Sequence, residues 1–185
     1  MGKRILASFF QSVTLRTAGF NTADLGAMND SSKAIMTLMM LIGGSPGSTA
    51  GGMKTTTIAV LILNAFATFG REPETEVFGR RFDNTVVKNA ATIAILYFFL
   101  FFTGGIAISQ IEHVALSDCL FETASAVGTA GLTLGITTEL GLVSHLILVV
   151  LMYLGRVGGL TLIYAAISVK IQSGAKRPLD KITVG

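Results

Sequence analysis

Long stretches of this sequence carry no charged side chain, and the longest covers residues 89–111. As a helix, about 20 mostly apolar residues cross the ~30 Å hydrocarbon core of a bilayer. Charged residues make up 14% of the 185-residue chain, against about 25% in a typical soluble domain. The sequence therefore predicts an integral membrane protein. It excludes a disordered chain, an ordinary soluble enzyme and, because Cys119 is the only cysteine, a domain held by internal disulfides.

The other charge-free runs predict two further membrane elements. Runs 140–155 and 157–169 make one span that contains Arg156, and runs 34–53 and 55–70 make one long element interrupted near its middle. An ionisable side chain at membrane depth is expensive and normally faces a cavity or a partner. We therefore expect Arg156 to face a pore.

The charges that are present gather in clusters. Eight of them lie in 71–88, and four basic residues lie near the C-terminus. Because basic residues favour the cytoplasmic side, we expect this loop and the C-terminal tail to be cytoplasmic in a multi-pass protein of the plasma membrane. The segment 112–139 has four acidic and no basic residues, which suits an external or re-entrant mouth for a cation. This distribution indicates membrane lipid, and no nucleic acid, as the surroundings of a chain with net charge +3.

Glycine is concentrated inside the interrupted element. Five of the 21 glycines fall within ten residues: Gly43, Gly44, Gly47, Gly51 and Gly52. Each glycine costs a helix interior about 1 kcal/mol relative to alanine, so the helix is predicted to break here. Irregular backbone at membrane depth is tolerated where protein buries it or where it lines a water-filled cavity, which places the break on a candidate ion pathway. The alternatives are close helix packing through small residues and, for Lys54, an amine that reaches the membrane interface.

The sequence also contains an internal repeat. Thr17-Ala18-Gly19 recurs as Thr129-Ala130-Gly131, and the same offset in numbering places Gly43 on Gly155 and Gly47 on Gly159. Each unit is predicted to contain a short helix, at about 5–15 and 116–127, a Thr-Ala-Gly turn, a polar segment, and an apolar helix that is broken or weakened at glycines. The span 89–111 precedes the second unit.

The two turns suit the binding of a dehydrated cation. Backbone carbonyls supply the oxygen ligands in potassium filters, and glycine permits the backbone angles that such filters need. The carbonyl end of the short helix before each turn favours a cation. Arg16 lies directly beside the first turn, and a carboxylate could brace it there. Glu122 is one candidate partner for Arg16.

Four segments together resemble the Trk/Ktr/HKT superfamily of K⁺, and sometimes Na⁺, uptake proteins: SFFQSVTLRTAGFNT, IGGSPGSTAGGMKTTT, FETASAVGTAGLT and YLGRVGGLT. The resemblance covers residues 8–185 and is closest to the C-terminal half of a KtrB/TrkH-type subunit. It implies an all-α membrane protein of membrane–pore–membrane repeats, with re-entrant pore loops and a broken transmembrane helix. Four such repeats surround one pore in the family, so the first two repeats and the opening helix of the third are expected to be missing from this chain.

The resemblance divides the chain into four parts. Residues 1–70 would be a partial third repeat, 71–88 a cytoplasmic loop, 89–170 a complete fourth repeat, and 171–185 the cytoplasmic tail. The implied partners are the missing N-terminal repeats, a second copy in a homodimer, and a cytosolic nucleotide-binding regulatory subunit. K⁺, with Na⁺ as the alternative, would be the transported ion, and no covalently bound cofactor is expected.

The resemblance also gives individual residues their roles. The residues implied to line the selectivity filter are Thr17, Ala18, Gly19, Thr129, Ala130 and Gly131, with K⁺ held by their backbone carbonyls. Adjacent to the filter are Arg16, Gly128 and Glu122. The implied gate below the filter consists of Gly43, Gly44, Ser45, Gly47, Gly51, Gly52, Lys54 and Arg156.

Three other readings of the sequence are weaker. Residues 47–55 resemble a phosphate-binding loop, but they have one residue too many before Lys54 and follow an apolar helical run instead of a β-strand. A broken-helix secondary transporter for another monovalent cation such as Na⁺ would need inverted repeats, whereas these two units run in the same direction. A non-transporting membrane scaffold explains the small residues but not two Thr-Ala-Gly turns in register. No catalytic constellation is visible, so an enzyme is not expected.

Overall fold

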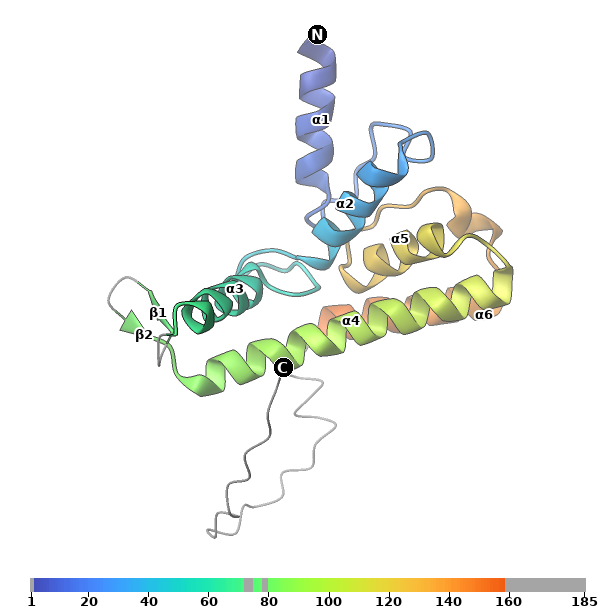
Figure 1. The fold of residues 1–185 in the computed structure, drawn as a ribbon. Coiled ribbons are helices and arrows are strands. Elements are labelled where there is room, and N and C mark those ends of the chain that lie inside the picture. Colours follow the sequence, from blue (N-terminus) through green and yellow to red (C-terminus); the bar gives the residue numbers. More distant parts are fainter. Residues whose placement is uncertain (1, 72–74, 78–79, 159–185) are drawn as a thin grey trace.

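The computed structural model describes residues 2–71, 75–77 and 80–158 of the chain. Figure 1 shows a helical protein in which the long helix α4 lies alongside α6. The helices are α1 (Gly2–Thr14), α2 (Asp30–Leu41), α3 (Thr55–Phe69), α4 (Asn84–Glu112), α5 (Leu116–Val127), the 3₁₀ turn η1 (Ile136–Glu139) and α6 (Leu142–Val157). The predicted tail 171–185 and the end of the predicted fourth repeat, including Gly159, lie outside the described residues.

Helix α4 is the described element that is long and apolar enough to cross a membrane, and α3 and α6 are shorter apolar helices. The first turn of α4 is capped by Asp83, whose carboxylate accepts a hydrogen bond from the Thr85 amide at 3.1 Å. That backbone bond holds the pKa of Asp83 below its usual value. The C-cap of the helix is His113, which adopts a left-handed conformation with φ 57°. The predicted span 89–111 is thus part of a helix of 29 residues.

The predicted interruption of the glycine-rich element is confirmed. Helix α2 ends at Leu41 and α3 begins at Thr55, and we call the segment between them, 42–54, the break loop. The ends of this loop are fastened together, because the Gly43 amide donates to the Met53 carbonyl at 2.7 Å and the Met53 amide donates to the Leu41 carbonyl at 3.1 Å. The helix therefore breaks into a closed loop that carries its own backbone hydrogen bonds.

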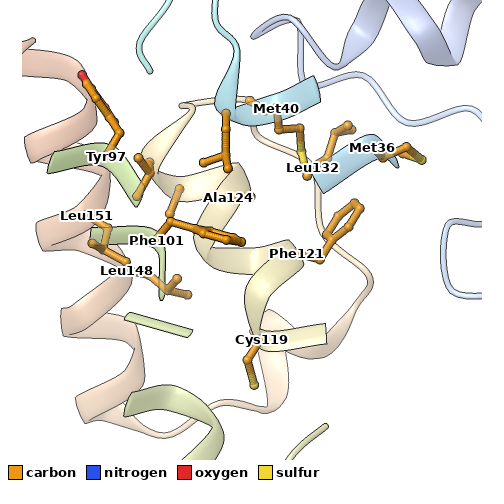
Figure 2. Packing of buried hydrophobic residues seen from close by; sticks show 14 of the residues in the cluster. Met36, Met40, Tyr97, Phe101, Cys119, Phe121, Ala124, Leu132, Leu148 and Leu151 are labelled. Atoms are coloured by element: carbon orange, nitrogen blue, oxygen red, sulfur yellow. The ribbon is translucent and has the colours of Figure 1, made fainter. Parts of the chain in front are cut away.

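Helix α5 packs against α2, α4 and α6, and its residues from Phe121 onward are buried. Figure 2 shows Met40 of α2 near Leu132 and Phe121, while Leu148 and Leu151 of α6 pack in the same cluster. Two glycines let backbones approach closely. A Cβ on Gly128 would overlap the Met40 carbonyl, and one on Gly155 would overlap the Val127 carbonyl. The small residues at these two positions thus allow close packing between helices.

Two further features complete the described fold, and the first departs from a purely helical expectation. The strands β1 (Glu76–Val77) and β2 (Arg80–Arg81) pair antiparallel in the charged loop before α4. Because each strand has only two residues, the pair is a local hairpin and does not form a layer of the fold. Helix α1 projects away from the other helices in Figure 1, and its apolar side chains, including Ile5 and Phe9, are exposed.

Candidate functional site

The two Thr-Ala-Gly turns share one unusual backbone conformation. Thr17 has φ 61° and Gly19 has φ 72°, and the second turn repeats this with φ 51° at Thr129 and φ 84° at Gly131. A positive φ is a genuine outlier for a β-branched residue, and such residues cluster at functional sites because the strain has to be held by the surroundings. The sequence repeat is therefore also a repeat of backbone geometry.

The two turns lie against each other although they are far apart in the sequence. A Cβ placed on Gly19 would be 3.0 Å from the Ala130 carbonyl oxygen and 3.7 Å from that of Gly131. In return, a Cβ on Gly131 would be 3.4 Å from the Cα of Gly19. Both positions favour glycine because of their positive φ, and at Gly19 the close approach to the Ala130 carbonyl also leaves little room for a side chain. The contact brings backbone carbonyls of the second turn to the first turn.

Each turn follows closely on the carbonyl end of a helix, and a hydroxyl group from that helix fixes the residue after the turn. The Thr14 hydroxyl accepts from the Phe20 amide at 3.0 Å and donates to the Phe20 carbonyl at 2.7 Å. In the second unit, the Ser125 hydroxyl accepts from the Leu132 amide at 2.9 Å. Thr14 and Ser125 are not equivalent under the offset that relates the two turns, so the repeat pattern did not reveal them.

The segment after the second turn is held by a buried carboxylate. Glu122 is only 4% exposed. Its oxygens accept hydrogen bonds from the Thr133 hydroxyl at 2.7 Å, the Leu134 amide at 2.8 Å and the Thr137 hydroxyl at 2.7 Å. Charge-assisted bonds of this kind are stronger than neutral ones. The carboxylate thus ties helix α5 to residues 133–137.

The pairing of Glu122 with Arg16, one option that the sequence left open, does not occur in the described part of the chain. Arg16 is exposed, and the three bonds from residues 133–137 occupy the carboxylate instead. The two threonines that bind Glu122 were missed by sequence reasoning. The signal that could have found them is a glutamate within an apolar helix, since such a group requires donors close by.

The break loop reaches the second turn and the end of α6. The Gly51 amide donates to the Thr129 hydroxyl at 3.0 Å, and the Gly52 amide donates to the Gly155 carbonyl at 3.3 Å. The guanidinium of Arg156 donates to the Thr49 carbonyl. Residues that the sequence assigned separately to a filter and a gate are therefore in direct contact.

The remaining loop residues shape the loop itself. Lys54 donates through its amine to the Ser48 and Ala50 carbonyls, so it braces the loop. The Ser45 carbonyl accepts from the Ser48 amide at 3.1 Å. Gly47 adopts φ 86°, and a Cβ there would meet nothing within 4 Å. A Cβ on Gly44 would overlap the Ser48 side chain, and one on Gly43 would overlap the Gly51 carbonyl.

Tyr97, to which the sequence assigned no role, also contacts the end of α6. Tyr97 of α4 is 2% exposed, and its hydroxyl donates to the Gly155 carbonyl at 3.3 Å. Figure 2 shows its oxygen directed toward α6. The Gly155 carbonyl therefore receives one donor from α4 and one from the break loop, immediately before Arg156.

A cavity of about 670 Å³ lies beside the second turn. Its lining includes Glu122, Thr129, Gly131, Thr137, Met152 and Arg156. Within the described residues, no group of three or more His, Cys, Asp or Glu side chains could hold a metal ion. The oxygen atoms that could meet a cation in this cavity come from backbone carbonyls, from the hydroxyls of Ser125 and the lining threonines, and from the carboxylate of Glu122.

Comparison with known proteins identifies related chains. The model of the TrkH family, described as cation transport protein, matches residues 1–175. The Ktr system potassium uptake protein B of Bacillus subtilis is 35% identical over 98% of this chain and 41% of its own length. The potassium/sodium uptake protein NtpJ of Enterococcus hirae is 34% identical over 99% of this chain and 42% of its own. The Ktr system potassium uptake protein B of Vibrio alginolyticus is 40% identical over 88% of this chain and 36% of its own.

These comparisons bear on the class of protein and on how much of it the chain represents. The relatives are named as ion uptake proteins and not as enzymes. The chain spans about two fifths of the length of the first two relatives.

Proposed function

Because this chain belongs to the TrkH cation transport protein family, we propose that it contributes part of a pathway for K⁺ uptake across the plasma membrane. The two Thr-Ala-Gly turns form half of a carbonyl-lined selectivity filter. The break loop, with Arg156, forms the gate beneath it. The rest of the filter comes from pore loops outside this chain.

The observation that carries this proposal is the shared strained geometry of the two turns. Thr17 and Thr129 both have positive φ, and Gly19 and Gly131 lie within contact distance. A left-handed residue after a helix is common but is usually glycine, so threonine at both positions is unusual. Two turns that only ended helices would also have no need to contact each other. Carbonyl ligands presented side by side are the chemistry by which a filter replaces the hydration shell of an ion.

The gate proposal is supported by the contacts of the break loop with Thr129, Gly155 and Arg156. A positive side chain on the cavity wall opposes a cation there, since like charges repel strongly where water is scarce. Displacement of the loop would break a small number of hydrogen bonds and leave its own closing bonds intact. A barrier of this kind can open without unfolding the helices around it.

The choice of ion and the partners are also part of the proposal. K⁺ is the ion named for both relatives called Ktr system potassium uptake protein B, and NtpJ is named for potassium and sodium. We therefore take K⁺ as the transported ion and Na⁺ as its competitor. By family resemblance, the transporting form is a homodimer that binds a cytosolic nucleotide-binding regulatory subunit. The basic residues of the 71–88 loop and of the C-terminal tail favour the cytoplasmic side for both.

Transport in cells that lack their own K⁺ uptake systems tests this function. Because the chain spans two fifths of its relatives, it is grafted in place of the matching part of the Bacillus subtilis protein, and membrane insertion is confirmed. Restored K⁺ uptake that discriminates against Na⁺ is the expected result. Insertion without uptake of either ion, in a graft whose parent protein transports, would reject the proposal.

A further inference from the structure

The hydrogen bond between Gly51 and Thr129 joins the two parts of the proposed pathway. The donor is a backbone amide of the break loop, and the acceptor is the side-chain oxygen of a turn residue, 3.0 Å away. The residues are 78 positions apart in the sequence. This bond is therefore a tertiary contact that exists only while the loop lies against the turn.

The fit around this bond is close. A Cβ on Gly51 would overlap both Oγ1 and Cγ2 of Thr129 and would approach the Gly155 carbonyl to 3.0 Å. Gly52 has φ 72°, and a Cβ there would lie 3.2 Å from the Cα of Gly128, the residue just before the turn. The loop backbone thus lies directly against the Thr129 side chain, with no room for a side chain on Gly51.

The two turns differ at this point. Among the described residues, the Thr17 hydroxyl makes no side-chain hydrogen bond, whereas the Thr129 hydroxyl accepts one from the loop. The turns are otherwise alike in backbone conformation. The asymmetry gives Thr129 a contact that its repeat partner lacks, and it makes Thr17 a matched control.

We propose that the Thr129 hydroxyl is a latch that couples the gate to the filter, so that the closed loop is held by the filter itself. A hydroxyl oxygen has two acceptor sites and one proton, and the Gly51 amide takes one of these sites in the closed state. When the loop leaves, that site becomes available to an ion in the cavity, which Thr129 lines. Opening the gate and completing the oxygen lining near the turn then become one event. This inference rests on the proposed function and assigns a positioning role to a residue of the filter.

The substitution that tests the latch is Thr129→Val, which keeps the β-branched shape and removes the oxygen. Loss of one neutral hydrogen bond corresponds to a factor of about two to ten in an equilibrium. We expect resting K⁺ uptake by the graft to rise by about this factor in Thr129→Val and to return toward the original value in Thr129→Ser. In a background that lacks loop residues 44–51, Thr129→Val should cause no further rise, because the donor is gone.

Thr17→Val separates a latch from a general effect on the filter. If it alters uptake, it should do so by the same factor with and without residues 44–51, since additivity is expected for sites that do not interact. If Thr129→Val is also additive with the loop deletion, the latch is rejected while the proposed filter stands. If Gly131→Asp leaves selective uptake intact, the filter assignment itself fails.

A second measurement does not depend on transport. Amide hydrogen exchange of the 185-residue chain in detergent reports on the loop peptide that contains Gly51. Thr129→Val is expected to speed exchange there by about two- to tenfold, and Thr129→Ser and Thr17→Val are expected to leave it near the original rate. Unchanged exchange in Thr129→Val would overturn the latch whatever the uptake assay shows. Gly51→Ala offers the same test from the loop side, because its Cβ would push the loop away from Thr129 and should also speed exchange.

Discussion

Gly19 and Gly131 face each other across the contact between two turns that are distant in the sequence. Each has positive φ, and a Cβ on Gly19 would lie 3.0 Å from the Ala130 carbonyl oxygen. The contact joins the C-terminal ends of α1 and α5, which are the ends that favour a cation. Two helix ends and two sets of carbonyls are thereby brought to one place.

Replacing Gly19 by alanine tests whether this contact is required. A non-glycine residue in the left-handed region costs about 1–2 kcal/mol, and the added Cβ would also press on the Ala130 carbonyl. We expect Gly19→Ala to reduce the discrimination of the graft between K⁺ and Na⁺, measured as competing uptake of the two ions. Gly2→Ala is the control, since a Cβ there has nothing within 4 Å. Equal discrimination in both variants would contradict the account.

Removing part of the break loop tests the gate. Residues 44–51 lie inside the closing bonds of the loop and include Gly51, which contacts Thr129, so their deletion removes the material beside the turn. We expect the rate of K⁺ uptake to rise, because a barrier is lost and the filter turns remain. A deletion variant that inserts normally and transports at the original rate would show that the loop is no gate.

The positive charge of Arg156 is predicted to oppose ion passage. Its guanidinium lines the cavity and binds the Thr49 carbonyl. Arg156→Gln removes the charge, and a barrier lower by about 1.4 kcal/mol corresponds to tenfold faster uptake. Arg156→Lys keeps the charge and should remain closer to the original rate. Uptake kinetics that are the same for the glutamine and lysine variants would exclude an electrostatic barrier.

Glu122 is predicted to stabilise the filter by holding the segment that follows the second turn. Arg16 does not share this role, since the described structure shows no ion pair between it and Glu122. Glu122→Ala removes the acceptor of the Thr133, Leu134 and Thr137 donors, and a hydrogen bond to a charged group contributes about 1.5–3 kcal/mol. We expect lower thermal stability in detergent and reduced ion discrimination.

Glu122→Gln is the matched variant, because it keeps one acceptor oxygen and the shape of the side chain. Its thermal stability should fall between that of Glu122→Ala and the original protein. If Glu122→Ala melts at the original temperature, the carboxylate does not hold residues 133–137 in the way described.

The sequence predicted much of the local structure because it carried strong local signals. The helix expected at about 116–127 has these bounds in α5, and the helix break at the glycine cluster lies where glycine and proline disfavour helix. The repeat also predicted which residues form equivalent turns, since a Thr-Ala-Gly tripeptide at a fixed offset is a local pattern.

The contacts between distant segments could not be predicted in the same way. The bond from Gly51 to Thr129 depends on how the break loop folds back, and nothing in either tripeptide encodes that path. The hydroxyl groups of Thr14 and Ser125 fix equivalent residues from positions that do not match under the repeat, so an alignment by offset conceals them. The sequence suggested Arg16 as the partner of Glu122 because their charges are opposite. In the structure, the buried carboxylate instead accepts hydrogen bonds from neutral donors 11 to 15 residues away.

The most direct test of the central claim is the selectivity of Gly131→Asp in the graft, measured as uptake of K⁺ in the presence of Na⁺. Aspartate places a negatively charged side chain at a positive φ beside Gly19, which strains the second turn and changes the charge next to its carbonyls. Loss of K⁺ flux, or of discrimination against Na⁺, is the result that we predict for an inserted protein. Discrimination equal to that of the unsubstituted graft would contradict the assignment of these turns to the selectivity filter.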